Sequence, residues 1–289
     1  MRPLIINAAL TGMVPTRKDN PNLPVTPEEI GEDARRCREA GAAIVHVHAR
    51  DADERPTYRL DVYREVVAAV RERCPDVIVC VSTSGRVFGE FEQRAEALSL
   101  DGVLKPELAS LTLGSLNFPK QASVNDPEMI RRLAERMAEC GIVPELEVFD
   151  FGMVDYSRYL LGKGVLRPPL YFNLLLGSLG TLAASPFNLA TLARALPDGV
   201  AWGATGIGRF QFQVNALAIT MGGHVRVGLE DALYMDAERR LPASNAKLVE
   251  RVAALARACE REVATPDQAR ELIGLTPRGK PGFPHEPPS

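Results

Sequence analysis

The sequence predicts a (β/α)8 barrel, the α/β fold known as the TIM barrel, and three observations support this prediction. Eight short runs with strand character alternate with amphipathic helical stretches along the 289 residues. Several helical stretches begin with a capping residue and a proline, and others end at a glycine just before the next strand. Eight β/α units in about 250 residues fit a barrel better than a doubly wound sheet.

The expected strands are short and mostly apolar. They lie at residues 4–9, 43–48, 77–82, 108–112, 143–149, 170–175, 201–205 and 225–228. Thr26-Pro27-Glu28-Glu29 predicts a helix start with an N-cap, a proline and a capping-box glutamate, and Asp126-Pro127-Glu128 repeats the cap and the proline. Gly41 and Gly141 each separate a helical run from a strand, where a residue with positive φ is favoured.

The predicted barrel occupies residues 1–265. Another capping box at Thr265-Pro266-Asp267-Gln268 predicts one more helix, after which the sequence becomes rich in proline and glycine. We therefore expect residues 266–289 to form a C-terminal helix and tail that wraps the barrel surface or a neighbouring subunit. This segment is too short and too irregular for a second domain.

The composition favours a protein that acts on small molecules. The formal net charge of −3 and the pI near 5.9 give no basic patch of the kind that nucleic acid or an anionic membrane surface attracts. We therefore expect neither as a partner. The five cysteines are scattered without a Cys-x-x-Cys spacing, which favours free thiols, and the apolar runs are too short for a membrane span. A cytoplasmic location is expected.

A pair of histidines in the second expected strand is the best indication of chemistry. Side chains alternate along a strand, so His46 and His48 project to one face while Val45 and Val47 pack on the other. Two adjacent imidazoles suit a divalent metal ion. A pair of hydrogen-bonded core histidines is the alternative that the pattern by itself leaves open.

Polar residues gather where the expected strands end, which is the catalytic face of such barrels. Besides the histidines, this set comprises Ser82, Thr83, Ser110, Thr112, Glu145, Glu147, Glu230 and Asp231. Any single member can instead be an internally hydrogen-bonded side chain, and Glu145 can pair with a lysine or arginine of a helix. The gathering of so many at one edge favours a site.

A catalytic zinc site needs a third protein ligand and one open position. Glu230 is the natural candidate, because only the first strand separates the second and eighth strands around the ring. Two histidines and one carboxylate also suit non-haem iron(II). A binuclear amidohydrolase site is disfavoured because it needs more histidines, and we expect His224 to pack or hydrogen-bond at the start of the eighth strand.

Several motifs in order resemble those of one family. They are Ala8-Ala9-Leu10-Thr11-Gly12, Asn22-Leu23-Pro24-Val25-Thr26-Pro27-Glu28-Glu29, His46-Val47-His48, Lys105-Pro106-Glu107, Gly206-Ile207-Gly208-Arg209 and Gly222-Gly223-His224-Val225-Arg226. From about residue 3 to about residue 275 the chain resembles the β-keto acid cleavage enzymes. The resemblance implies a zinc-containing TIM barrel, usually a homotetramer, in which a β-keto acid and acetyl-CoA give acetoacetate and a new acyl-CoA.

The resemblance also implies roles for individual residues. It places zinc on His46, His48 and Glu230, the three residues that the strand geometry proposes. The other implied roles are an acid/base pair of Asp231 with Arg226, hydroxyls for the substrate at Ser82 and Ser110, with Thr112 beside them, a substrate contact at Glu147, and a CoA-facing segment with Gly206, Gly208 and Arg209.

The chemistry of the implied reaction limits these roles. A free aspartate has a pKa near 3.9, and a close arginine would lower the pKa of Asp231 further. We therefore expect the metal ion to supply much of the driving force as a Lewis acid at the keto oxygen. Arg226 then positions its partners, and the hydroxyls of Ser82 and Ser110 can bind a carboxylate or an oxyanion.

One departure from the family bears on the substrate. Members that act on an amino-bearing substrate carry an acidic residue after the first strand, where this chain has Val14. We therefore predict a neutral or apolar acyl tail, although the nearby loop with Arg17 can supply another contact. Two alternatives remain: a metal-dependent aldolase or lyase that acts without CoA, and a non-catalytic metal or acyl-CoA binding protein.

Overall fold

A computed structural model describes residues 1–118 and 121–277. Its eight longer strands close into a parallel barrel, with neighbours in the order β1-β12-β11-β10-β9-β6-β5-β2. The strands are β1 (Ile6–Ala9), β2 (Ile44–Val47), β5 (Ile78–Val81), β6 (Leu108–Thr112), β9 (Val143–Val148), β10 (Tyr171–Leu176), β11 (Ala201–Gly206) and β12 (His224–Val227). The TIM barrel prediction is confirmed, and the strand ends differ from those expected by no more than two residues.

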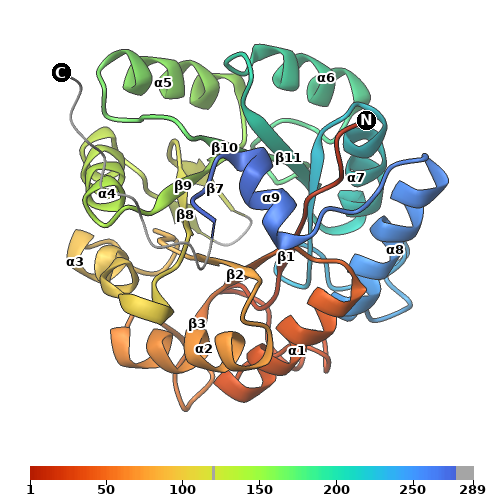
Figure 1. The fold of residues 1–289 in the computed structure, drawn as a ribbon, viewed down its shortest axis with the longest axis horizontal. Helices are drawn as coiled ribbons and strands as arrows, with labels where there is room; N and C mark the ends of the chain where they lie inside the picture. Colours follow the sequence, from red (N-terminus) through yellow and green to blue (C-terminus); the bar gives the residue numbers. More distant parts are fainter. Residues whose placement is uncertain (119–120, 278–289) are drawn as a thin grey trace.

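Helices surround the barrel in the order of the sequence (Figure 1). They are α1 (Pro27–Ala40), α2 (Leu60–Arg73), α3 (Phe91–Ala95), α4 (Pro127–Glu139), α5 (Phe151–Gly162), α6 (Pro186–Ala195), α7 (Gln211–Thr220) and α8 (Asn245–Ala258), and a further helix, α9 (Pro266–Ile273), lies across the end of the barrel. The capping boxes at Thr26 and Thr265 and the Asp126 cap form as predicted. Gly41 and Gly141 have φ values of 120° and 61°, as residues that end helices do.

Strand alternation separates two layers of the core. Val45 and Val47 pack outward among the apolar residues between the strands and the helices. Ile44 points into the barrel, where it joins Ile5, Ile78 and other side chains of the lower interior. The two-residue period of a strand then directs His46 to the same inner side, one step nearer the carboxyl ends of the strands.

The helix α9 closes the bottom of the barrel, which faces the viewer in Figure 1. Ala269 and Ile273 of α9 belong to the apolar cluster of the lower interior. Nearby, the ring Nδ1 of His224 accepts a hydrogen bond of 3.0 Å from the backbone N–H of Ile5, so its expected packing role is confirmed. The division into a barrel of residues 1–265 and a segment of residues 266–289 stays a prediction, and residues 278–289 lie outside the described part.

Two short hairpins that the sequence did not indicate lie on the opposite side of the barrel. One pairs β3 (Ala49–Arg50) with β4 (Pro56–Thr57), and the other pairs β7 (Leu116–Asn117) with β8 (Ala122–Ser123). Both follow barrel strands and contribute residues to the cavity described below. None of the helices within the described ranges has the length and apolar character that crossing a bilayer requires.

Candidate active site

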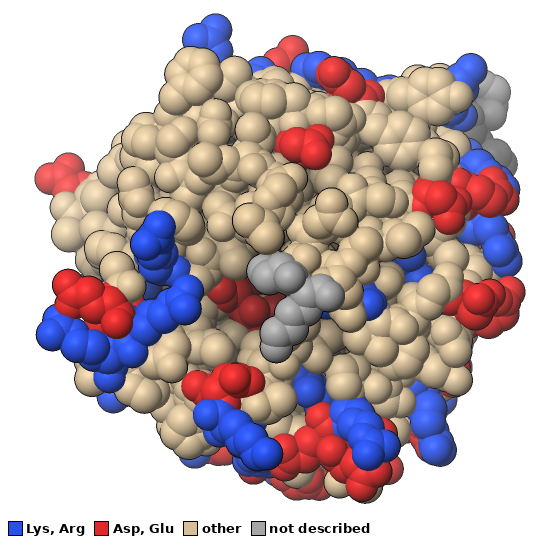
Figure 2. Space-filling view, turned by 180° about the vertical axis from the view of Figure 1, so that it is seen from behind, with Lys and Arg blue, Asp and Glu red and all other residues tan. Residues whose placement is uncertain are grey.

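A cavity of about 1170 Å³ opens at the carboxyl ends of the barrel strands. Figure 2 views this face, which is hollowed near its centre, with acidic atoms inside the hollow. The predicted site residues that line the cavity are Val14, His46, His48, Ser82, Ser110, Thr112, Glu147, Gly208, Arg209, Arg226, Glu230 and Asp231. The structure therefore brings together side chains that the sequence places up to 217 positions apart, from Val14 to Asp231.

The candidate metal ligands meet at one wall of this cavity. β1 pairs with both β2 and β12, so the ends of the latter two strands approach each other. The Nε2 atoms of His46 and His48 lie 3.2 Å apart, and His48 Nε2 lies 3.2 Å from Glu230 Oε1. The potential ligand atoms of the three residues all lie within 4.8 Å of one another.

This donor set fits a divalent ion. Glu230 Oε2 is buried and has no hydrogen-bond partner among the residues that the structure describes, which is costly for a carboxylate unless a cation completes its surroundings. Burial opposes the charge of Glu230, but His48, Arg226 and His46 outweigh it and hold the pKa of this carboxyl well below its usual range. Glu230 is thus an ionised carboxylate of the kind that zinc or iron(II) binds.

Glu145 orients the first histidine from inside the barrel. Its Oε2 lies 3.2 Å from His46 Nδ1, and its Oε1 accepts a bond of 2.6 Å from Asn7 Nδ2. A carboxylate on Nδ1 directs the other ring nitrogen of His46 toward the proposed metal. The alternative that Glu145 pairs with a helix residue is wrong: it is fully buried in the barrel interior, where its partners lie on strands.

Arg226 links the carboxylates of the site. Its side chain is 1% exposed, because β12 directs it into the barrel. The guanidinium contacts Asp231 Oδ2 at 2.8 Å, Glu230 Oε1 at 2.9 Å and Glu147 Oε1 at 3.3 Å. Such charge-assisted contacts fix the directions of the three carboxylates, so Arg226 is placed to position them.

The pKa of Asp231 differs from the sequence-based expectation. Burial and the charge of Glu230 outweigh the attraction of Arg226 and raise this pKa above its usual value. The expectation of a lowered pKa for Asp231 was wrong because it took account of Arg226 but not of burial or of the charge of Glu230. A raised pKa makes Asp231 a stronger proton acceptor than a free aspartate.

The predicted substrate hydroxyls fall into two kinds. The Oγ atoms of Ser82 and Ser110 accept backbone N–H bonds of 3.1 and 3.2 Å from Ser84 and Thr83, which leaves each O–H able to donate to a ligand. Thr112 instead donates its hydroxyl to Glu147 at 2.7 Å. Thr112 therefore lines the cavity mainly as a support for Glu147.

Gly206 and Gly208, at the end of β11 and just after it, are explained by backbone packing and hydrogen bonding more than by ligand binding. A Cβ on Gly206 would lie 2.2 Å from the carbonyl oxygen of Phe210, so only glycine permits this close approach. The N–H of Gly208 donates to the carbonyl of Asp231 at 2.7 Å and is not available to a phosphate group. Arg209, whose side chain is exposed, supplies the charged group that this segment adds to the cavity lining.

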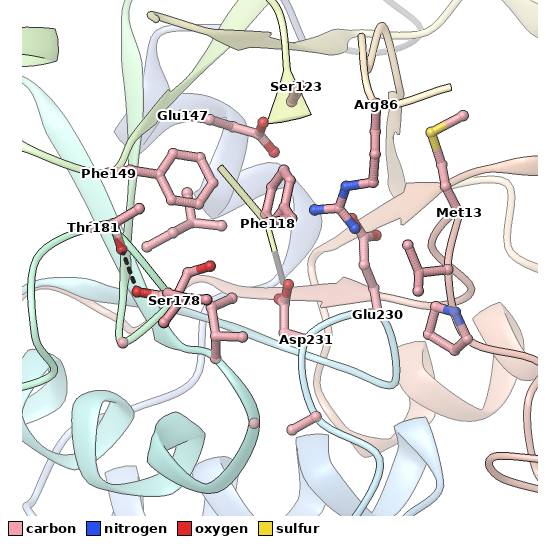
Figure 3. A pocket seen from close by; sticks show the side chains of 18 of the residues that line it. Met13, Arg86, Phe118, Ser123, Glu147, Phe149, Ser178, Thr181, Glu230 and Asp231 are labelled. Atoms are coloured by element: carbon pink, nitrogen blue, oxygen red, sulfur yellow. Dashed lines mark hydrogen bonds between the residues drawn. The ribbon is translucent and has the colours of Figure 1, made fainter. Parts of the chain in front are cut away.

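Two arginines that line the cavity, Arg86 and Arg239, were not considered in the sequence analysis. Arg86 extends from the loop after β5, and its guanidinium lies 3.3 Å from the ring centroid of Phe118 near the second hairpin (Figure 3). The sequence signal that could have identified Arg86 was its position shortly after an expected strand. Arg17 pairs with Glu29 and Glu54, and a contact of its loop with the acyl tail stays a prediction.

Comparisons with known proteins agree with this architecture. The family model for the beta-keto acid cleavage enzyme matches residues 3–275. The 3-keto-5-aminohexanoate cleavage enzyme of Fusobacterium nucleatum is 42% identical over 276 residues, which cover 95% of this chain and 99% of that protein. The 3-oxoadipate:acetyl-CoA acetyltransferase of Cupriavidus necator is 38% identical over 278 residues, or 95% of each chain.

A solved structure supports the fold. The apo structure of ObcA has a TM-score of 0.77 and 24% identity, covering 88% of this chain and 66% of the ObcA chain. This chain thus spans about two thirds of ObcA but nearly the whole of the curated relatives. The family match over almost the entire chain and the identity to two of its enzymes establish that this protein belongs to the beta-keto acid cleavage enzyme family and is an enzyme of the acyltransferase class.

Proposed function

We propose that this enzyme condenses a β-keto acid with acetyl-CoA to give acetoacetate and a new acyl-CoA, with zinc held by His46, His48 and Glu230. One observation carries the proposal: Arg226 joins the candidate metal ligand Glu230 and the candidate base Asp231 through the same guanidinium. The Cupriavidus relative, which acts with acetyl-CoA by its name, supports the choice of co-substrate.

A zinc ion at this site would supply Lewis acidity toward the keto oxygen of the substrate. Asp231 accepts the proton from carbon 2, which its raised pKa favours. Carbon 2 then attacks the acetyl thioester and releases the CoA thiolate. The thiolate takes the acyl group as the bond between carbons 2 and 3 breaks, and Asp231 returns the proton to acetoacetate.

The remaining residues bind and orient the reactants. Ser82 and Ser110 donate their hydroxyl protons to the substrate carboxylate or to an oxyanion, a contribution worth roughly 3 kcal/mol for one preorganised donor. Glu147 contacts the reacting part of the substrate, and Thr112 holds it in place. Arg209 faces the CoA side at the rim of the cavity.

The acyl tail carries no positive charge in this proposal. Val14 lines the cavity and is 47% exposed, so the position offers a hydrocarbon surface to a ligand. An ammonium tail would find no carboxylate at Val14 and would meet the cation of Arg86. We also propose, from family membership, a homotetramer that acts in the cytoplasm.

The test is an acyl-CoA assay by mass spectrometry with zinc-loaded protein, acetyl-CoA and a panel of β-keto acids. Acetoacetate together with the matching acyl-CoA is expected, and Asp231→Asn should lower kcat by about 100-fold or more. Consumption of β-keto acid without acetyl-CoA would support an aldolase or lyase instead. No turnover by metal-loaded protein over the whole panel would contradict the proposal.

A further inference from the structure

Arg86 is an unusual cation because it lines the cavity and forms no ion pair with a carboxylate among the residues that the structure describes. Its Nε is buried and has no hydrogen-bond partner in the described ranges. Its guanidinium stacks on Phe118, which fixes its direction without neutralising its charge. Figure 3 shows this guanidinium directed toward the centre of the cavity, on the side of Glu230.

The carboxylates nearest to Arg86 already serve another partner. Glu230, Glu147 and Asp231 all favour its charge, yet burial still lowers the pKa of Arg86. The same three carboxylates contact Arg226 directly. Because an arginine stays protonated in proteins, the cavity holds a guanidinium whose donors are available to a ligand.

Arg86 lies on the same side of the cavity as the segment with Val14. Figure 3 shows Arg86 next to Met13, the neighbour of Val14, whereas Ser178 and Thr181 line the opposite wall. Val14 is the position that faces the acyl tail in the proposed function. Arg86 therefore lies where the end of the tail would lie.

The reactive carboxylate of the substrate has other donors. Ser82 and Ser110 lie deeper, at the ends of β5 and in β6, and both are buried. Arg86 lies further along the same loop and nearer the mouth, where its side chain is only partly buried. A substrate that reaches both places needs two anionic groups, one at each end.

We propose that Arg86 binds a carboxylate at the end of the acyl tail, so that the preferred substrates are 3-oxo dicarboxylic acids. This inference rests on the proposed function and names its substrate class. The acyl group leaves as an ω-carboxyacyl-CoA, and carbons 1 and 2 of the substrate leave in acetoacetate. This inference changes the earlier prediction of a neutral or apolar tail. The tail carries no positive charge, but it ends in a carboxylate.

The experiment compares three six-carbon substrates that differ at the tail end: 3-oxoadipate, 3-oxohexanoate and 6-amino-3-oxohexanoate. Their kcat and KM are measured with acetyl-CoA for the wild type, Arg86→Gln and Arg86→Lys. A matched control is Arg239→Gln, which removes another arginine of the cavity wall, next to Gly208. Calorimetric binding of 3-oxoadipate and 3-oxohexanoate without acetyl-CoA supplies a second measurement that needs no turnover.

We expect the wild type to prefer 3-oxoadipate to 3-oxohexanoate by about 10- to 100-fold in kcat/KM, mainly through KM. Arg86→Gln should bring this ratio to about 1, while kcat and KM for 3-oxohexanoate stay within about twofold of the wild-type values. Arg86→Lys, which keeps the charge but loses the fork of donors, should retain part of it. Arg239→Gln should leave the ratio unchanged.

Two outcomes separate the inference from the proposed function. Equal turnover of the two acids, or a ratio that survives Arg86→Gln, would overturn the role of Arg86 while the acetyl-CoA reaction stands. If no acid turns over, the proposed function fails, and calorimetry then decides on Arg86 alone. In that case, tighter binding of 3-oxoadipate that is lost in Arg86→Gln would support the carboxylate site, and its absence would refute it.

Discussion

The two ends of the barrel both bury charges but balance them differently. At the bottom, Glu107 lies between two arginines, with its oxygens 2.6 Å from Arg71 and 2.9 Å from Arg270. The backbone N–H of Val79 adds a third donor to the same carboxylate. One acid thus holds a helix of the outer ring and the closing helix α9 to the start of β6.

At the mouth of the barrel the ratio of arginines to carboxylates is reversed. Arg226 is one cation that contacts several acids, and its partners are Glu145, Glu147, Glu230 and Asp231. A surplus of buried negative charge is unfavourable without a further cation. The charges at the bottom therefore balance within the protein, whereas those at the mouth leave an acidic excess that suits the metal ion of the proposed function.

The largest effect is expected from removing a ligand at the mouth. His46→Ala should abolish stoichiometric zinc binding and lower acetoacetate formation by about 1000-fold or more, because Lewis-acid assistance is worth several kcal/mol. Elemental analysis and the acyl-CoA assay measure the two losses. Retained zinc with full activity in His46→Ala would end the assignment of this cluster.

The next largest effect is expected on stability, from a substitution at the bottom of the barrel. Glu107→Gln leaves Arg71 and Arg270 buried beside a neutral group and should lower the free energy of unfolding by about 3 to 5 kcal/mol. Denaturant unfolding measures it, while kcat of the folded enzyme should change little. Asp267→Asn is the matched control, because Asp267 also pairs with Arg270 but its side chain is 81% exposed. A control that destabilised equally would contradict the importance of burial.

A smaller effect at the mouth is expected from Glu145→Gln. The variant keeps a hydrogen-bond acceptor near His46 but removes the charge that orients the ring, so zinc affinity should fall by about 10- to 100-fold. Competition with a chelator measures this affinity. Unchanged affinity would show that the backbone of β2 positions His46 without help from the carboxylate charge.

The smallest effect is a pH dependence of stability at the bottom. Burial and the charge of Arg261 lower the pKa of His224 to about 3. The unfolded chain, with an ordinary histidine pKa, therefore binds a proton first as the pH falls, and stability present above about pH 6.5 is lost progressively below it. Between pH 7 and pH 5 this loss is about 2 kcal/mol.

The matched variant for this pH dependence is His224→Gln, which cannot titrate in that range. Its stability should fall by about 2 kcal/mol less than that of the wild type over the same interval. Urea unfolding at a series of pH values compares the two proteins. Parallel curves for both would exclude His224 as the origin of the dependence.

The sequence predicts the regular part of this molecule well because the regular part depends on local signals. Caps such as Thr26 and the apolar alternation around His46 act over a few residues, and the structure has the helix and the strand where these signals lie. The approach of Glu230 to the histidines could also be predicted, because closing eight strands places β1 between β2 and β12.

The contacts that local signals cannot predict depend on distant parts of the chain. Asp231 has a raised pKa because its burial and Glu230 outweigh Arg226, and burial is a property of the whole fold. Arg86 stacks on Phe118, a residue 32 positions away near a hairpin that carries no strong turn signal. The candidate metal ligands are therefore easier to predict than the residues proposed to select the substrate.

The bottom of the barrel also has a consequence for how the chain folds. Leu4 pairs with Val263 and exchanges backbone hydrogen bonds with Glu262 and Ala264, so β1 and the segment before α9 are tied together across about 260 positions. During synthesis β1 therefore has one open edge until β12 emerges, and the barrel floor stays uncovered until α9 follows. A ribosome-bound chain that ends at residue 260 should accordingly be cut by protease where the released full-length chain resists it.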